Sequence, residues 1–247
     1  MNINPDFDDA ALSQFLKAKV FGRPKPYFSA KTTTECIRHW MSALVPIEPS
    51  NACGLDIAEP DIHEQSLARV LHKLERRDGS FLCGGTNNTL ARVFRLMGYE
   101  AVTLCIGDPD IGLAHIVTLV RTANRPDLPI ELHDAYFNYT LVGNGSQPLD
   151  FFDARRKLLE AKSDGVQMSR LRTWKTELSP QPHANAGFGR HLRAWYWNDP
   201  NWHAWLSDKG GRKMVDVFKY VTNVYGGESA DLLAHVTDRL DRTPLGR

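Results

Sequence analysis

Long apolar runs and an excess of charge of one sign are both missing from this sequence. No apolar stretch approaches the ~20 residues that a membrane-spanning helix needs. The 30 basic residues nearly balance the 29 acidic ones, which leaves a formal net charge of +1. Such a balance gives no global electrostatic attraction to nucleic acid or to an anionic membrane. We therefore expect neither a membrane nor a nucleic acid among the partners.

The sequence also lacks the pattern of an N-terminal export signal. Residues 1–9 are acidic and no apolar run follows them, whereas a signal peptide begins with basic residues and continues into an apolar core. This pattern predicts a cytoplasmic protein. Secretion as an effector, by a route that needs no N-terminal signal, is the alternative.

Cysteine is scarce. The chain has four, and none is spaced as a C-x-x-C pair, so the sequence favours neither a structural zinc site nor a disulfide framework. We expect reduced thiols, no metal and at most one or two cysteines that take part in chemistry. The four cysteines are Cys36, Cys53, Cys83 and Cys105.

The composition that is present suits a globular protein. With 42% hydrophobic and 24% charged residues among 247, the chain can build a full core in one large domain or in a core with an appendage. We predict an N-terminal helical region at 1–77, a catalytic core at 78–145 and a helical, tryptophan-rich region at 146–247. One compact domain overall is the alternative.

Apolar residues at helical spacing predict helices in both outer regions. In the N-terminal region we expect helices over 8–19, 32–44 and 61–77. In the C-terminal region we expect helices over 148–163, 211–224 and 229–241, with Ser229 as the N-cap of the last one. The aromatic stretch from Trp195 to Trp205 is expected to form the core of these helices, and stacking on a sugar, a base or a planar acyl group is the alternative.

The central region predicts a helix followed by an antiparallel meander. Leu90, Val93, Phe94 and Met97 share one face of a helix expected over 86–97, and Gly98 is a suitable stop. Strands are expected over 101–106 and 113–121, and a third from about residue 130. Their short connections allow neighbouring strands to pair.

Cys83 directly precedes this helix and is followed by Gly84 and Gly85. A thiol attacks a carbonyl well only as the thiolate, and a helix N-terminus or an imidazolium lowers a thiol pKa. Glycines let backbone come close to a substrate and let N–H groups point at a developing oxyanion. Cys83 is therefore the candidate nucleophile.

His115 and Asp134 lie on the second and third expected strands. Both faces of the second strand are largely apolar, so a histidine there needs a polar partner, and Asp134 is well placed to supply it. Glu131, His133 and Asp127 are nearby, and a shift of one residue in the strand pairing would exchange the faces. A cysteine, a histidine and an orienting carboxylate are the parts of a nucleophilic acyl-transfer site.

Two stretches carry a family resemblance. The first is Gly-Ser-Phe-Leu-Cys-Gly-Gly-Thr-Asn-Asn-Thr-Leu-Ala-Arg-Val-Phe-Arg-Leu-Met-Gly-Tyr-Glu-Ala, and the second is Leu-Ala-His-Ile-Val-Thr-Leu-Val followed by Leu-His-Asp-Ala-Tyr-Phe-Asn. Together they resemble the nucleophile, histidine and aspartate segments of transglutaminase-like, papain-like cysteine enzymes. The resemblance covers residues 78–140. It implies an α+β fold in which a nucleophile helix packs on a small antiparallel sheet, with N-terminal helices and a C-terminal helical cap.

The resemblance also implies a function. Cys83 would attack an amide or thioester carbonyl, His115 would act as the base, Asp134 would orient it, and no cofactor would be needed. The arylamine N-acetyltransferases resemble the same block, because Asn87 follows the cysteine by four residues as in their motif. A CoA-dependent acyltransferase, or a binding module or effector without chemistry, are the alternatives. The candidate substrate-side residues are Gly84, Asn87, Tyr136 and Asn138.

Overall fold

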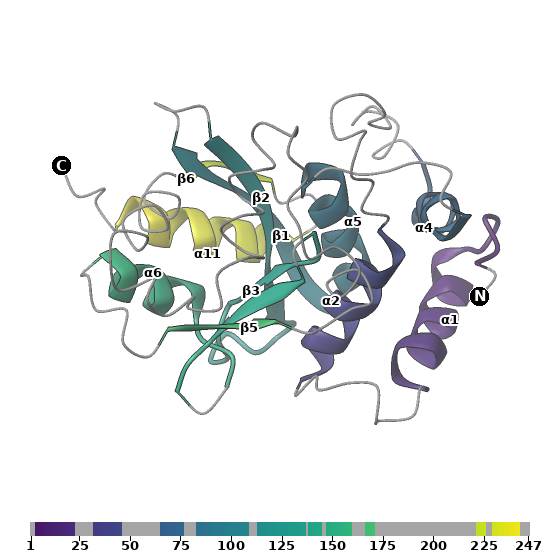
Figure 1. Cartoon of the computed structure of the whole chain (residues 1–247), viewed down its shortest axis with the longest axis horizontal. Helices are drawn as coiled ribbons and strands as arrows, with labels where there is room; N and C mark the ends of the chain where they lie inside the picture. Colours follow the sequence, from purple (N-terminus) through teal and green to yellow (C-terminus); the bar gives the residue numbers. More distant parts are fainter. Residues whose placement is uncertain are drawn as a thin grey trace, which may run out of the picture. The chain divides into compact units, whose positions relative to one another are not determined.

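The computed structural model describes residues 3–22, 32–45, 65–76, 83–108, 113–136, 138–144, 147–159, 166–170, 221–225 and 229–242. The chain divides into two compact units (Figure 1). The first comprises Met1–Met97, Ala135–Asn138 and Leu171–Asn198, and the second comprises Gly98–Asp134, Tyr139–Arg170 and Asp199–Arg247. The central region expected at 78–145 therefore contributes to both units.

The first unit contains the helices expected near the N-terminus and the nucleophile helix. Their bounds are α1 Asp9–Phe21, α2 Thr33–Leu44, α4 Leu67–Arg76 and α5 Cys83–Leu96. The sequence prediction is confirmed for all four, with one difference: α5 begins at Cys83 itself and not at Thr86. The start of the helix expected over 61–77 lies outside the described residues.

Local signals explain where these helices begin and end. The Asp8 carboxylate accepts a hydrogen bond from the Ala11 N–H at 2.8 Å and so caps α1. Thr32 and Glu35 form a reciprocal capping box at the start of α2. Just beyond α5, Gly98 has a φ of 91°, a conformation that side chains disfavour and glycine allows.

The apolar faces of the four helices form the core of the first unit. α2 packs against α1, α4 and α5. The predicted stripe of α5 is confirmed for Leu90, Val93 and Phe94, which are fully buried, while Met97 is half-buried. The other fully or almost fully buried side chains on these helices include Leu12, Leu16, Val20, Ile37, Met41, Val70, Leu71 and Leu74.

The second unit is built on an antiparallel sheet whose described strands run in the order β5-β4-β3-β2-β1-β6. The expected meander is confirmed and is longer than the sequence predicted, because β1 and β2 each extend over ten residues. The bounds are β1 Tyr99–Asp108, β2 Leu113–Thr122, β3 Glu131–Asp134, β4 Tyr139–Val142, β5 Gln167–Arg170 and β6 Val221–Tyr225.

The strand β6 corrects part of the sequence prediction. A helix was expected over 211–224, but Val221–Tyr225 is a strand paired with β1, and residues 211–220 lie outside the described residues. This segment is rich in β-branched and aromatic side chains, and pairing with a sheet edge decides such short segments. With β5, it means that the C-terminal region is not helical throughout.

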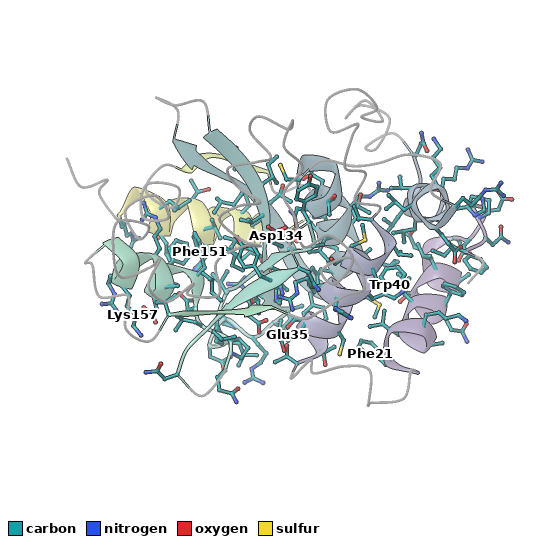
Figure 2. The ribbon with its side chains drawn as sticks, viewed as in Figure 1. Phe21, Glu35, Trp40, Asp134, Phe151 and Lys157 are labelled. Carbon is teal, nitrogen blue, oxygen red and sulfur yellow. The ribbon has the colours of Figure 1, made fainter. Side chains whose placement is uncertain are left out.

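Two helices expected from the sequence are confirmed in the second unit, α6 at Phe151–Leu159 and α11 at Ala230–Asp241. The Asp150 carboxylate ties them together. It accepts hydrogen bonds from the N–H groups of Phe152 and Ile130 and lies 3.5 Å from the Arg239 guanidinium on α11. Phe151 lies at the start of α6 (Figure 2).

Ser229 takes the N-cap position of α11, as expected, but its hydroxyl forms a hydrogen bond with the sheet and not with the helix. It makes no capping hydrogen bond and instead accepts one from the Ala101 N–H of β1 at 3.1 Å. α11 packs on β1 and β6. The segments Ala101–Leu104 and Val117–Val120 are buried on both faces, which confirms the prediction of a doubly buried second strand over Val117–Val120.

Taken element by element, the chain is a mixture of helices and an antiparallel sheet, compatible with the α+β class. Among the described residues, no helix is both long enough and apolar enough to cross a membrane.

Candidate functional site

Cys83 is the first residue of α5 and is half-buried. The first backbone N–H groups of a helix have no partner within the helix, and the positive end of the helix dipole favours an anion there. Gly84 and Gly85 follow and are buried, and the first turn contains no acidic residue. Cys83 therefore lies at a helix N-terminus next to two glycines.

Three polar side chains of the next turns of α5 are completely buried: Thr86, Asn87 and Thr89. The Thr89 hydroxyl donates to the Gly85 carbonyl at 2.8 Å, within the helix. The Thr86 hydroxyl oxygen makes no hydrogen bond. The Asn87 carbonyl oxygen accepts a hydrogen bond from the backbone N–H of Ala135 at 3.1 Å, so the side chain is used outside its own helix.

The turn Ala135–Asn138 belongs to the first unit and is held there at both ends. Asn87 of α5 binds its first residue. At its last residue, the Asn138 amide nitrogen lies 3.1 Å from Nδ1 of His39 on α2. Asn138 has a φ of 57°, in the left-handed region that asparagine tolerates better than most residues. The turn is therefore shaped by its own sequence and fixed by two helices.

The two other triad candidates lie in the second unit. His115 is on β2, opposite Ile106 of β1. Asp134, labelled in Figure 2, is the last residue of β3, opposite Tyr139 of β4. Its side chain is fully buried. The pairing of β2 with β3 sets Thr118 opposite His133.

The pairing of β2 with β3 indicates which face of the sheet Asp134 and its neighbours occupy, a point that the sequence left open. If the register continues by one residue, Asp134 lies opposite Val117, and strand alternation then assigns positions 115, 117 and 134 to one face of the sheet. Positions this close on adjacent strands are diagonal neighbours. His133 and Glu131 lie on the other face, where His133 Nε2 is 2.8 Å from the Glu131 carboxylate.

Asp127, the remaining acidic neighbour, lies in an exposed turn. Its two carboxylate oxygens are 2.9 and 2.8 Å from the guanidinium nitrogens of Arg125. That hydrogen bonding, together with the positive charge, lowers the pKa of Asp127. The Asp127 carboxylate is therefore bound by Arg125, a residue two positions away in the chain.

The candidate substrate-side residues differ in their exposure. Gly84, Asn87 and Asn138 are buried, and Tyr136 is half-buried. Asn87 and Asn138 have protein partners in the turn and on α2. The tryptophan-rich stretch from Trp195 to Trp205 lies outside the described residues.

The other cysteines have different surroundings. Cys36, on α2, is half-buried, and burial together with the neighbouring Glu35 carboxylate raises its pKa, against the smaller opposite effect of Arg38. Cys105 is half-buried on β1, where it pairs with Ile116. Cys53 lies outside the described residues. None of the three described cysteines forms a disulfide.

The sequence reasoning missed a buried polar face on α2. Thr34, Glu35, Arg38 and Ser42 are all buried, and Arg38 is the largest completely buried side chain in the described residues. Its guanidinium lies 3.9 Å from the Glu35 carboxylate. Positions 35, 38 and 42 fall on one helical face, a spacing that would have revealed it. His39 was also missed.

No group of three potential metal ligands occurs among the residues that the structure describes. Comparison of the chain with protein-family models, with curated proteins and with solved structures finds no match.

Proposed function

We propose that this chain is a thiol-dependent acyl-transfer enzyme with Cys83 as nucleophile, His115 as general base and Asp134 as the group that orients the histidine. The observation that carries the proposal is the position of Cys83 at the first residue of α5. A cysteine at a helix N-terminus is predisposed to ionise, and two small residues follow it.

The second support comes from the sheet. His115 and Asp134 are on adjacent antiparallel strands, and continuing the register puts both positions on one face. Asp134 is completely buried, and a buried carboxylate needs polar partners. The proposal includes the finer fold assignment, a papain-like or transglutaminase-like core, in which such a histidine and aspartate serve one thiol.

The proposed chemistry follows from these roles. His115 removes the Cys83 proton, and the thiolate attacks the carbonyl carbon of an amide or thioester. The imidazolium then returns the proton to the leaving amine or thiol as the acyl-thioester forms. Water or an amine, activated by the same histidine, attacks the acyl-thioester and releases Cys83. Backbone N–H groups at the start of α5 are suited to stabilise the oxyanion in both steps.

The substrate class is an amide or a thioester, as part of a peptide, a protein or a small molecule. Hydrolysis and transfer to an amine use the same first half-reaction. A CoA thioester as donor, and a binding module without chemistry, make different predictions for that half-reaction, so one experiment separates them.

The test is to trap the acyl-enzyme. The native protein is mixed with p-nitrophenyl acetate, nitrophenol release is followed, and the modified residue is identified by peptide mass spectrometry. We expect a burst with acetyl on Cys83, and loss of both in Cys83→Ser. Acetyl-CoA in place of the ester identifies the CoA-dependent alternative if it acetylates Cys83 equally fast.

His115→Ala and Asp134→Asn should slow the burst strongly, with Asp134→Asn the milder of the two because the base remains. His133→Gln is a suitable control, since His133 lies on the other face of β3. Acetylation of Cys83 no faster than that of Cys36 would contradict the proposal and favour the binding module.

A further inference from the structure

The hydrogen bond between Asn87 and the turn reaches the peptide group of Asp134. The N–H that Asn87 accepts from is that of Ala135, the residue bonded directly to the Asp134 carbonyl carbon. The six atoms of a peptide group lie in one plane, so this N–H and the Asp134 Cα belong to the same rigid group. Fixing the N–H therefore restricts the orientation of the Asp134 backbone.

Asn87 stands four residues after Cys83 in α5, a spacing at which helical residues are neighbours on one face. The same helix thus presents the thiol at its first residue and grips the peptide after Asp134 one turn later. Asn87 is completely buried and its carbonyl oxygen is already engaged by the protein. These features suit a structural contact better than a contact with substrate.

We propose that Asn87 is a positioning residue, which fixes Asp134 for its work on His115 by holding the Ala135 N–H. The inference rests on the proposed function of Cys83, His115 and Asp134. At the other end of the turn, the contact between Asn138 and His39 of α2 helps to hold the turn in place. The turn Ala135–Asn138 is then the link through which the nucleophile helix sets the carboxylate.

The test compares four single variants and one double variant of the full chain by the pH profile of Cys83 alkylation with iodoacetamide. Asn87→Ala removes the acceptor. Asn138→Gly removes the contact with His39 and leaves a residue that adopts a φ of 57° without strain. Thr89→Val is the matched control, because Thr89 is equally buried in α5 and its hydrogen bond stays within the helix. Asp134→Asn removes the carboxylate charge that Asn87 is proposed to position.

If the inference is right, Asn87→Ala slows alkylation of Cys83 near pH 6.5 by about tenfold, which corresponds to a rise of one unit in its apparent pKa. The rate above pH 10 stays at the wild-type value. Asn138→Gly shifts the profile in the same direction by less, and Thr89→Val leaves it unchanged. Should Asn87→Ala fail to fold, Asn138→Gly against Thr89→Val decides the question.

The coupling to Asp134 provides the sharper readout. In the Asp134→Asn background, Asn87→Ala should produce no additional shift, since a positioning residue has nothing left to position. Additive shifts in the double variant would overturn the inference. So would a profile that moves equally in Asn87→Ala and Thr89→Val, because loss of stability would then explain both.

The failure of the two proposals can be told apart. If wild-type Cys83 shows no activation, the proposed function fails and the positioning role fails with it. If wild-type Cys83 is activated and Asp134→Asn reduces that activation, but a folded Asn87→Ala protein keeps the wild-type profile, only the positioning role is wrong.

Discussion

The helices α2 and α5 each carry a cysteine near the N-terminal end, and the two ends are built differently. At α2 a capping box uses the first N–H groups: the Thr32 hydroxyl accepts from the Glu35 N–H at 3.2 Å, and the Glu35 carboxylate accepts from the Thr32 N–H at 3.3 Å. Cys36 follows this acidic cap and its pKa is raised. At α5 the cysteine comes first, and no acidic residue lies in the first turn.

The comparison shows that two cysteines near helix N-termini can have different surroundings: a capping box with an acidic residue precedes Cys36, whereas the first turn of α5 contains no acidic residue. Glu35 lies next to Cys36, so a thiolate there would meet both desolvation and a like charge. Cys83 stands beside two glycines instead. Under the proposed function, the same residue type stays protonated in one helix and ionises in the other.

The largest expected effect concerns the buried charge that balances the α2 cap. Arg38→Met keeps most of the side-chain volume but leaves the buried Glu35 carboxylate without its nearby guanidinium (Figure 2 labels Glu35 and, on the same helix, Trp40). Removing one member of a buried ion pair costs about 3 kcal/mol. Urea unfolding should show this loss, and alkylation of Cys36 should become slower still, since Arg38 is the cation that favours its thiolate. An unchanged midpoint would contradict the role given to Arg38.

The next effect concerns the cap itself. Thr32→Ala removes the hydroxyl that accepts from the Glu35 N–H and should destabilise the fold by about 1 kcal/mol. Thr33→Ala is the control, because Thr33 is exposed and lies outside the capping pair. Equal loss of stability in the two variants would argue against the capping box as the organiser of this end.

At α5 the corresponding change should be stabilising. Thr86→Val replaces a completely buried hydroxyl that makes no hydrogen bond with a methyl group of similar size. Removing an unsatisfied buried polar group should raise the free energy of unfolding by about 1 kcal/mol or less. Loss of stability on this substitution would mean that the hydroxyl has a partner in solution.

Most of the elements were predictable because their apolar residues repeat at regular spacing. They are the helices α1, α2, α4 and α5, the strands of the meander, and the helices α6 and α11. The strand β6 was not predicted, because its β-branched and aromatic residues favour a strand only weakly and its pairing with β1 cannot be read from the sequence. Cys83, His115 and Asp134 could be proposed from their order along the chain. The sheet face that each of these side chains occupies could not be predicted without the register of strand pairing, because a shift of one residue would place His133 on the face that Asp134 occupies.

The supporting contacts were the part that sequence could not supply. Asn87 was a candidate for its spacing from Cys83, but its bond to the Ala135 N–H joins residues 48 positions apart in the chain. The His39 contact with Asn138 spans 99 positions. Long-range contacts of this kind depend on how elements pack and leave no periodic trace in the sequence.

The smallest expected effect is on the pH dependence of stability. The pKa of Cys36 is higher in the folded than in the unfolded chain, so the folded state holds its proton longer. Its contribution to stability is complete below the unfolded thiol pKa of about 8.5 and is lost as pH rises through the folded pKa. Cys36→Ala should flatten the alkaline fall in urea midpoint, relative to the wild-type chain, while Cys105→Ala serves as the control. If the urea midpoint of Cys36→Ala fell with rising pH as steeply as that of the wild-type chain, the raised pKa assigned to Cys36 would be contradicted.

The most direct test of the central claim measures Cys83 and Cys36 in the same native sample. Alkylation by iodoacetamide is followed from pH 5 to 10, and each cysteine is read separately by peptide mass spectrometry. The account predicts that Cys83 reacts fast with an apparent pKa well below about 8.5, that Cys36 reacts slowly with a higher one, and that His115→Ala removes the difference. Equal rates at Cys83 and Cys36 across this range would contradict an activated thiol at the start of α5.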